Sequence, residues 1–189
     1  MIDIEKNKAE FKAIVNSTIH RDGINELMNW LDTTDFYTAP ASAKYHGNEP
    51  GGLCAHSLGV YNCLKVMQRD ESDETIAIAA LFHDLCKVNF YKVSTRNTKD
   101  ESGKWIQVPF YEYRQDDLIP LGHGEKSMFI IMQYMKLSPE EACAIRHHMG
   151  GYYTKNPGED QALGQALGLY QLVLKLQTAD SQSAFWYHM

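Results

Sequence analysis

Histidine and aspartate side chains recur at separate points of the chain, at or near the ends of predicted helices. His83 and Asp84 directly follow an apolar helical run, and Asp180 lies in a mostly apolar segment. An acid in such a segment needs a partner, because burying an unpaired charge is costly. Groups on facing helices of a bundle can converge on one internal metal site. The candidate ligands are His56, His83, Asp84, His123, His147, His148 and Asp180.

These ligand types narrow the choice of metal. Imidazole together with carboxylate suits Mn, Fe, Ni or Zn better than the hard cations Ca and Mg. The four cysteines form no CxxC pair, which disfavours a structural zinc site. Each residue also has a plainer interpretation. His56 alone could be a cap or a surface residue, and His147 and His148 could meet the exposed carbonyl groups of a helix end.

The order His, His-Asp, His, His-His, Asp resembles the HD-domain superfamily of metal-dependent phosphohydrolases, over roughly residues 45–185. GGLCAHSL resembles the Gly-Gly entry to the family's first histidine, and HDLCK resembles its His-Asp segment, with Cys86 where glycine is usual. The resemblance implies one divalent transition-metal ion held by His56, His83, Asp84 and Asp180. It implies a second ion held through His123, His147 and His148, with Asp84 bridging the two.

The resemblance also implies a reaction, hydrolysis of a phosphoester by metal-activated hydroxide. Asp84 and Lys87 are the expected catalytic residues, with Lys87 assisting the phosphate. Trp105, Tyr111 and Tyr113 could stack on a base or simply pack against the helices. Further expected substrate contacts are Lys87, Arg114, Arg146, Tyr152 and Lys155.

Several functions remain open on these residues. The favoured one is a phosphohydrolase acting on a nucleotide or a related small phosphomonoester. A phosphodiesterase for cyclic dinucleotides, or a 3′–5′ exonuclease for short RNA, is the alternative, and a sensor that binds a nucleotide without turnover is another. The formal net charge of −6 disfavours a protein that coats long nucleic acid.

The elements that position these residues are predicted to be mainly helical. The fold class is all-α, an HD-domain-like helical bundle with a β-hairpin insertion at about 88–114, where aromatic and β-branched residues flank a polar turn. Ser72 and Ser138 are predicted helix caps. One long final helix is expected from about Asp160 to at least Phe185. Helices are also expected at about 3–19, 22–31, 53–69, 73–84, from 122, and from 138 to 150.

The 189 residues fit a single domain, in which N-terminal helices in 1–35 pack on a metal-binding core of 45–185. Apolar residues make up 44% of the chain and charged residues 22%, which is ordinary for a globular protein. No apolar run reaches the roughly 18 residues of a membrane span. The charged N-terminus lacks a signal core, so a cytoplasmic location is expected. Formation of a homo-oligomer through the first helices is left open.

Overall fold

A computed structural model describes residues 2–116, 118–152 and 156–186, without the side chains of Tyr152 and Trp186. The α-helices in chain order are α1 (Ile4–Thr18), α2 (Ile24–Leu31), α3 (Gly52–Val66), α4 (Asp73–Phe82), α5 (His123–Met132), α6 (Pro139–His147), α7 (Pro157–Leu169) and α8 (Gln171–Trp186). Two short 3₁₀ helices are η1 (Leu85–Lys87) and η2 (Gly150–Tyr152), and the strands are β1 (Tyr91–Lys99) and β2 (Trp105–Tyr113).

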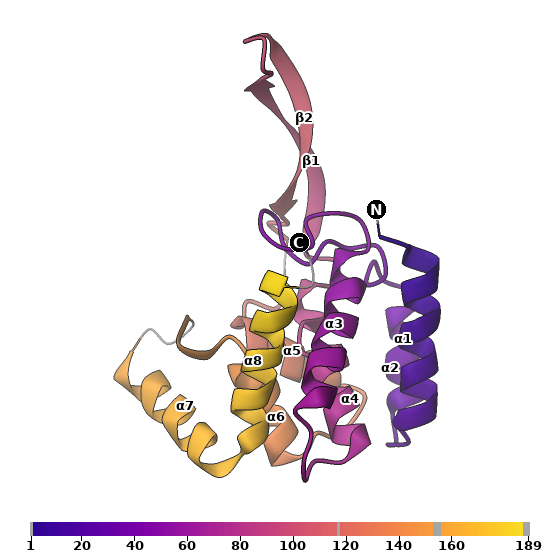
Figure 1. Cartoon of the computed structure of the whole chain (residues 1–189), viewed down its shortest axis with the longest axis vertical. Helices are drawn as coiled ribbons and strands as arrows, with labels where there is room; N and C mark the ends of the chain where they lie inside the picture. The colour runs from indigo at the N-terminus through magenta and orange to yellow at the C-terminus, as the bar shows by residue number, and fades with distance from the viewer. Residues whose placement is uncertain (1, 117, 153–155, 187–189) are drawn as a thin grey trace.

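The protein is mostly helical, as predicted, and its two strands form the expected antiparallel hairpin within residues 88–114. The fold is therefore not strictly all-α. The strands pair from Tyr91 with Tyr113 to Lys99 with Trp105. At the turn, the Asp100 carboxylate accepts hydrogen bonds from the backbone N–H groups of Ser102 (2.9 Å) and Lys104 (3.0 Å). The hairpin projects away from the helical body, as Figure 1 shows.

Helix α4 is the centre of the hydrophobic core. Every residue from Ile76 to Phe82 is buried, so this helix is apolar all round. Helix α3 packs between α4 and α8, and α1 packs on α3 and α4 (Figure 1). The rings of Phe11 and Phe82 lie 5.9 Å apart at their centroids and join α1 to α4. The apolar run before His83 is thus a core helix that ends at the candidate site.

The helix starts follow the predicted caps. The Ser72 hydroxyl accepts a hydrogen bond from Thr75 N–H at 3.1 Å. Ser138 and Glu141 form a complete capping box at the start of α6. The prediction of a single long final helix was wrong. The helix is interrupted at Tyr170, whose backbone is extended (φ −131°, ψ 113°). This break lets α7 turn outward while α8 stays packed along α3 and α6.

A buried ion pair ties the N-terminal part of the chain to α6. The Arg21 guanidinium donates to both carboxylate oxygens of Glu141 (2.5 and 3.0 Å), and Glu141 is fully buried. Removing one partner of a buried pair leaves an uncompensated charge. Arg21 is partly exposed, so we expect Arg21→Met to lower the free energy of unfolding by about 2 kcal/mol, below the full cost of a wholly buried pair.

Urea denaturation of the Arg21→Met protein, with metal content measured in parallel, checks this expectation. Exposed Arg69 provides the control, because Arg69→Met should change the stability by less than about 0.5 kcal/mol. Equal stabilities of the two variants would mean that the Arg21–Glu141 pair does not hold these parts together.

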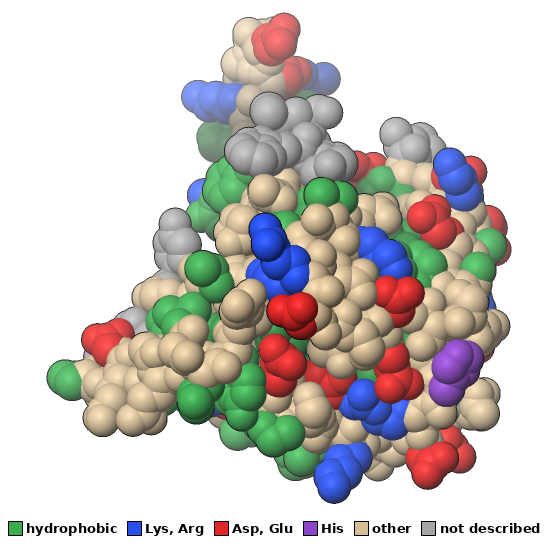
Figure 2. All heavy atoms as spheres, turned by 60° about the horizontal axis from the view of Figure 1, so that its bottom comes forward, with side chains coloured by type: hydrophobic (Ala, Val, Ile, Leu, Met, Phe, Trp, Pro, Cys, Tyr) green, Lys and Arg blue, Asp and Glu red, His purple; other side chains and the backbone are tan. Residues whose placement is uncertain are grey.

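The surface opposite the hairpin carries interspersed acidic and basic side chains (Figure 2). Exposed leucines, among them Leu167, Leu169 and Leu174, lie on α7 and the start of α8. Within the residues that the structure describes, every helix is too short or too polar to cross a lipid bilayer.

Candidate metal centre

The Asp84 carboxylate is the centre of a buried cluster. It follows the last turn of α4, with its backbone at φ −108° and ψ 21° as the chain enters η1. Its oxygen Oδ2 lies 3.3 Å from His83 Nε2 and 2.6 Å from Lys87 Nζ. Its oxygen Oδ1 lies 3.5 Å from His148 Nε2, at the end of α6. One carboxylate thus faces ring nitrogens on both sides.

Helices α3 and α8 add His56 and Asp180 to this cluster. His56 Nε2 lies 3.0 Å from Asp180 Oδ1 and 3.7 Å from Asp84 Oδ2. The Ser183 hydroxyl, one turn after Asp180, lies 3.1 Å from His56 Nδ1 and orients the ring. Gly59 faces Ser183, and a Cβ there would lie 2.5 Å from the Ser183 hydroxyl oxygen. The two helices approach this closely because Gly59 has no side chain.

Backbone carbonyl groups orient two of the imidazole rings. His83 Nδ1 lies 2.8 Å from the Ala80 carbonyl oxygen, and His148 Nδ1 lies 2.7 Å from that of Ile145. A carbonyl only accepts, so each Nδ1 carries the proton. The Nε2 atoms of both rings are buried and make no hydrogen bond to any described residue. This arrangement is typical of metal-ligating histidines, and it fits a bound metal ion.

A second group of possible ligands lies on the Oδ1 side of Asp84. His123 begins α5, and its Nδ1 lies 2.8 Å from the Cys86 sulfur. The rings of His123 and His148 have their centroids 6.1 Å apart. Asp84, Cys86 and His123 each offer a ligand atom within 4.8 Å of the others, as do His56, His83 and Asp84. A third such group is His83, His148 and Asp180, so His148 borders both sides of the cluster.

The protonation states of Asp84, Asp180, His56 and His123 suit metal binding. Burial opposes ionisation of Asp84, but Lys87 and His83 hold the pKa of its carboxyl well below the usual value. Burial also opposes ionisation of Asp180, whose pKa the neighbouring His56 lowers. Burial lowers the pKa of His56, and it lowers that of His123 to about 4. Metals bind ionised carboxylates and neutral imidazoles, so these four side chains already have the required charge. Two neighbours must lose a proton before they bind an ion. Burial opposes the charge of His83, but Asp84 and Asp180 raise its pKa, and burial raises the pKa of the Cys86 thiol to about 12.

Three predicted site residues lie apart from the cluster. The ring of His147 lies against the Arg146 guanidinium, with Nε2 2.7 Å from Nη1. Successive helical residues point about 100° apart, so the rotation of α6 that turns His148 toward Asp84 turns His147 away from it. Arg146 pairs with Glu125 at 3.0 Å, and Arg114 pairs with Asp116 at 2.8 Å.

Lys87 lies in the cluster, whereas Lys155 and the side chain of Tyr152 lie outside the described residues. His46 was not predicted as a ligand, yet its ring centroid lies 4.8 Å from that of His56. Burial, together with His56 and Lys87, lowers the pKa of His46 to about 4. Its position in the glycine-rich loop before α3 was the available signal.

Comparison with protein-family models matches the HD domain over residues 53–181. The chain belongs to the HD-domain family. The matched range runs from α3 to α8 and contains every predicted metal ligand of this HD domain. HD domains bind divalent metals and are in general metal-dependent phosphohydrolases. Neither the curated proteins nor the solved structures compared with this chain gave a match.

Gly124 sets the distance between the two helices that carry His123 and His148. A Cβ at Gly124 would lie 2.1 Å from the Arg146 carbonyl oxygen, a backbone atom that cannot rotate away. We expect Gly124→Ala to separate α5 from α6, to destabilise the protein by about 1–3 kcal/mol, and to weaken metal binding.

Thermal denaturation and metal analysis of the purified Gly124→Ala variant check this result. Gly164→Ala in α7 is the matched control, because a Cβ there meets nothing within 4 Å and should stabilise the helix by about 0.5–1 kcal/mol. A Gly124→Ala protein as stable as the unchanged chain would contradict the expected crowding.

Proposed function

We propose that this HD domain hydrolyses the phosphoester of a nucleotide or a related small phosphomonoester, using two divalent transition-metal ions. The observation that carries the proposal is the Asp84 carboxylate, which has the Nε2 atoms of His83 and His148 on either side and Lys87 beside it. A carboxylate can bridge two cations because it has two oxygens and a negative charge.

The ligands divide between the two oxygens of Asp84. His56 and His83 lie nearer Oδ2, where Asp180 completes the set for one ion. His148 lies nearer Oδ1 and, with His123, belongs to the set for a second ion. Metal ions in such a centre lower the pKa of bound water and offset charge on the phosphate oxygens.

Lys87 is proposed to bind the substrate phosphate. Burial disfavours its charge, but the neighbouring Asp84 carboxylate raises the pKa of the Lys87 ammonium above the usual value. The group therefore stays positive, and Asp84 engages one of its three N–H donors at 2.6 Å. Its remaining donors can bind an anionic phosphate held at the metal ions.

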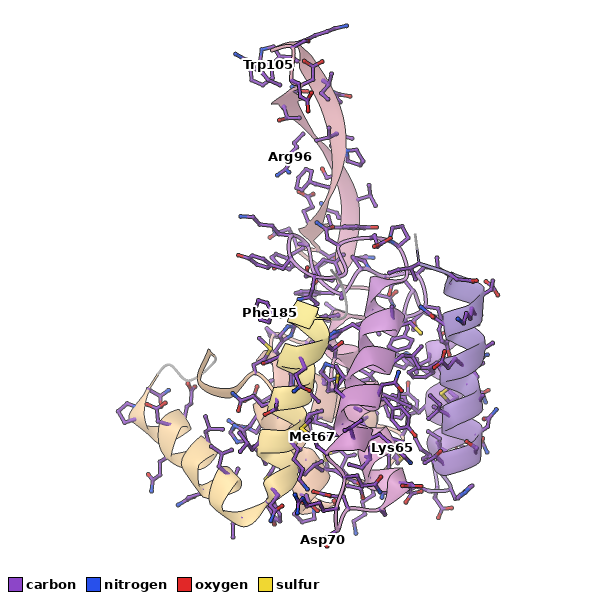
Figure 3. The ribbon with its side chains drawn as sticks, viewed as in Figure 1. Lys65, Met67, Asp70, Arg96, Trp105 and Phe185 are labelled. Carbon is purple, nitrogen blue, oxygen red and sulfur yellow. The ribbon has the colours of Figure 1, made fainter. Side chains whose placement is uncertain are left out.

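The hairpin favours a second candidate function, hydrolysis of the phosphodiester bonds of a short oligonucleotide. Tyr91 and Tyr113 pair across the base of the hairpin, with ring centroids 5.7 Å apart, and Tyr113 is largely exposed. Arg96 lies partway along the hairpin and exposed Trp105 at its far end, as Figure 3 shows. Aromatic and cationic side chains of this kind stack on bases and bind phosphates.

A metal and substrate screen tests both candidates. The purified protein, loaded separately with Mn, Fe, Ni and Zn, is assayed on nucleoside monophosphates, bis(p-nitrophenyl) phosphate and short RNA. Turnover of the monophosphates is the expected result. Turnover of only the diesters would overturn the first candidate in favour of the second. Absence of bound metal under all conditions would overturn both.

A further inference from the structure

Cys86 lies inside the cluster, two residues after Asp84. Its side chain is almost fully buried, at 2% exposure. Its sulfur lies 2.8 Å from His123 Nδ1 and 3.9 Å from Asp84 Oδ1. Its backbone N–H donates to the Ser127 hydroxyl at 3.0 Å, which ties η1 to α5. The backbone of η1 thus holds the sulfur against the first residue of α5.

We propose that the Cys86 thiolate is a direct ligand of the second metal ion, together with Asp84, His123 and His148. This inference rests on the proposed metal centre and adds a ligand to it. An independent observation points to the same ion, namely the buried Nε2 of His148, which makes no hydrogen bond within the described part of the chain. That nitrogen and the Cys86 sulfur both face the same oxygen of Asp84, with His148 Nε2 at 3.5 Å and the sulfur at 3.9 Å from Oδ1.

The position of His147 supports the proposal that Cys86 takes its place as a ligand. The resemblance to HD domains places this histidine at the second ion, but its ring lies against Arg146. Cys86 stands where those proteins usually have glycine. The second ion therefore gains a possible ligand in Cys86 and loses the expected one in His147. One sulfur, two imidazole nitrogens and one carboxylate oxygen form a four-ligand set of the kind that zinc accepts.

A thiolate ligand has a consequence for metal choice. Soft sulfur ligands favour zinc, iron or cobalt, whereas oxygen ligands suit magnesium, calcium and manganese. The second ion of this centre is therefore a thiophilic metal. A simpler role for Cys86 is a thiol hydrogen bond to His123 Nδ1, and a serine hydroxyl could make the same bond.

Cobalt(II) is the probe that separates these roles, because a cobalt–thiolate bond gives a near-ultraviolet charge-transfer absorption. The protein is loaded with cobalt and examined as the full chain, as the triple variant Cys54→Ala, Cys63→Ala, Cys143→Ala, and as Cys86→Ser. We expect the absorption in the full chain and in the triple variant, whose only thiol is Cys86. We expect Cys86→Ser to lose it and to bind the second ion more than about 100-fold more weakly.

The triple variant decides the question even if Cys86→Ser does not fold. An absorption band in that variant can come only from Cys86, and its absence overturns the proposal. Binding of two cobalt ions without the band would leave the proposed hydrolase centre intact. Binding of no cobalt at all would overturn the metal centre and the ligand role of Cys86 together.

Discussion

Asp84→Asn is expected to abolish hydrolysis and, separately, to destabilise the metal-free fold. The asparagine side chain has nearly the same shape but carries no charge to offset two cations. Loss of a bridging ligand should lower kcat by on the order of a thousandfold, about 4 kcal/mol of transition-state stabilisation. An assay of phosphoester turnover at saturating metal measures this effect, and unchanged turnover would show that Asp84 does not bridge the ions.

The effect on stability follows from Lys87, whose ammonium is buried and lies 2.6 Å from Asp84. Asp84→Asn leaves this charge without its counterion, which should cost about 3 kcal/mol of unfolding free energy in the presence of a chelator. Adding Lys87→Met removes the unpaired charge, so the double variant should regain most of that loss. Its activity should remain as low as that of Asp84→Asn.

The double variant therefore separates folding from chemistry, because its unfolding free energy recovers and its phosphoester turnover does not. Asp70→Asn is the matched control. Asp70 is exposed at the end of the helical body opposite the hairpin (Figure 3), so neither stability nor turnover should change. Failure of Lys87→Met to restore stability would mean that Asp84 stabilises the fold through the histidines instead.

Each bound metal ion is expected to raise the melting temperature by about 8–16 °C. A ligand at a thousandfold excess over its Kd stabilises the native state by about 4 kcal/mol, and each kcal/mol shifts the melting temperature of a chain this size by roughly 2–4 °C. The physical reason lies in His83 and His148, whose buried Nε2 atoms make no hydrogen bond to any residue the structure describes. Each of the two proposed ions would satisfy one of these nitrogens.

Differential scanning calorimetry with and without chelator measures this shift. Calcium serves as the control cation, because its preference for oxygen ligands should leave the melting temperature nearly unchanged. Asp180→Asn should reduce the shift with zinc or manganese, since Asp180 belongs to the first ligand set. Equal shifts with calcium and with the transition metals would indicate nonspecific binding to surface carboxylates.

The sequence predicted most of the helices, because caps such as Ser138 and apolar runs such as Ile76–Phe82 act locally. The break at Tyr170 was missed. The sequence there has no proline, and the nearby Gly164 and Gly168 only weaken a helix. What decides the break is the packing of α8 against α3 and α6, which depends on residues far apart in the chain.

The sequence also predicted most of the candidate site. The order of histidines and aspartates indicated which residues could converge, and the structure brings six of the seven together. The sequence could not reveal that His147 lies against Arg146, because the rotation of α6 about its own axis depends on the helices packed against it. The sequence also left the role of Cys86 open, since the contact of its sulfur with His123 joins residues 37 positions apart.

The projecting hairpin has a consequence for the cooperativity of unfolding. Its two strands pair with each other and with no other described strand. An isolated two-stranded ribbon is marginally stable in water. Its outer half should therefore open many times while α4 stays closed, as a separate unit of local unfolding.

Hydrogen exchange would display this difference directly. The amide groups near Trp105 should exchange close to the rate of an unstructured peptide, and those of α4 only at global unfolding. Equal protection of these two regions, measured without any added ligand, would contradict this expectation. The chain thus joins a stable helical body, in which Asp84 is buried, to a ribbon that opens locally on its own.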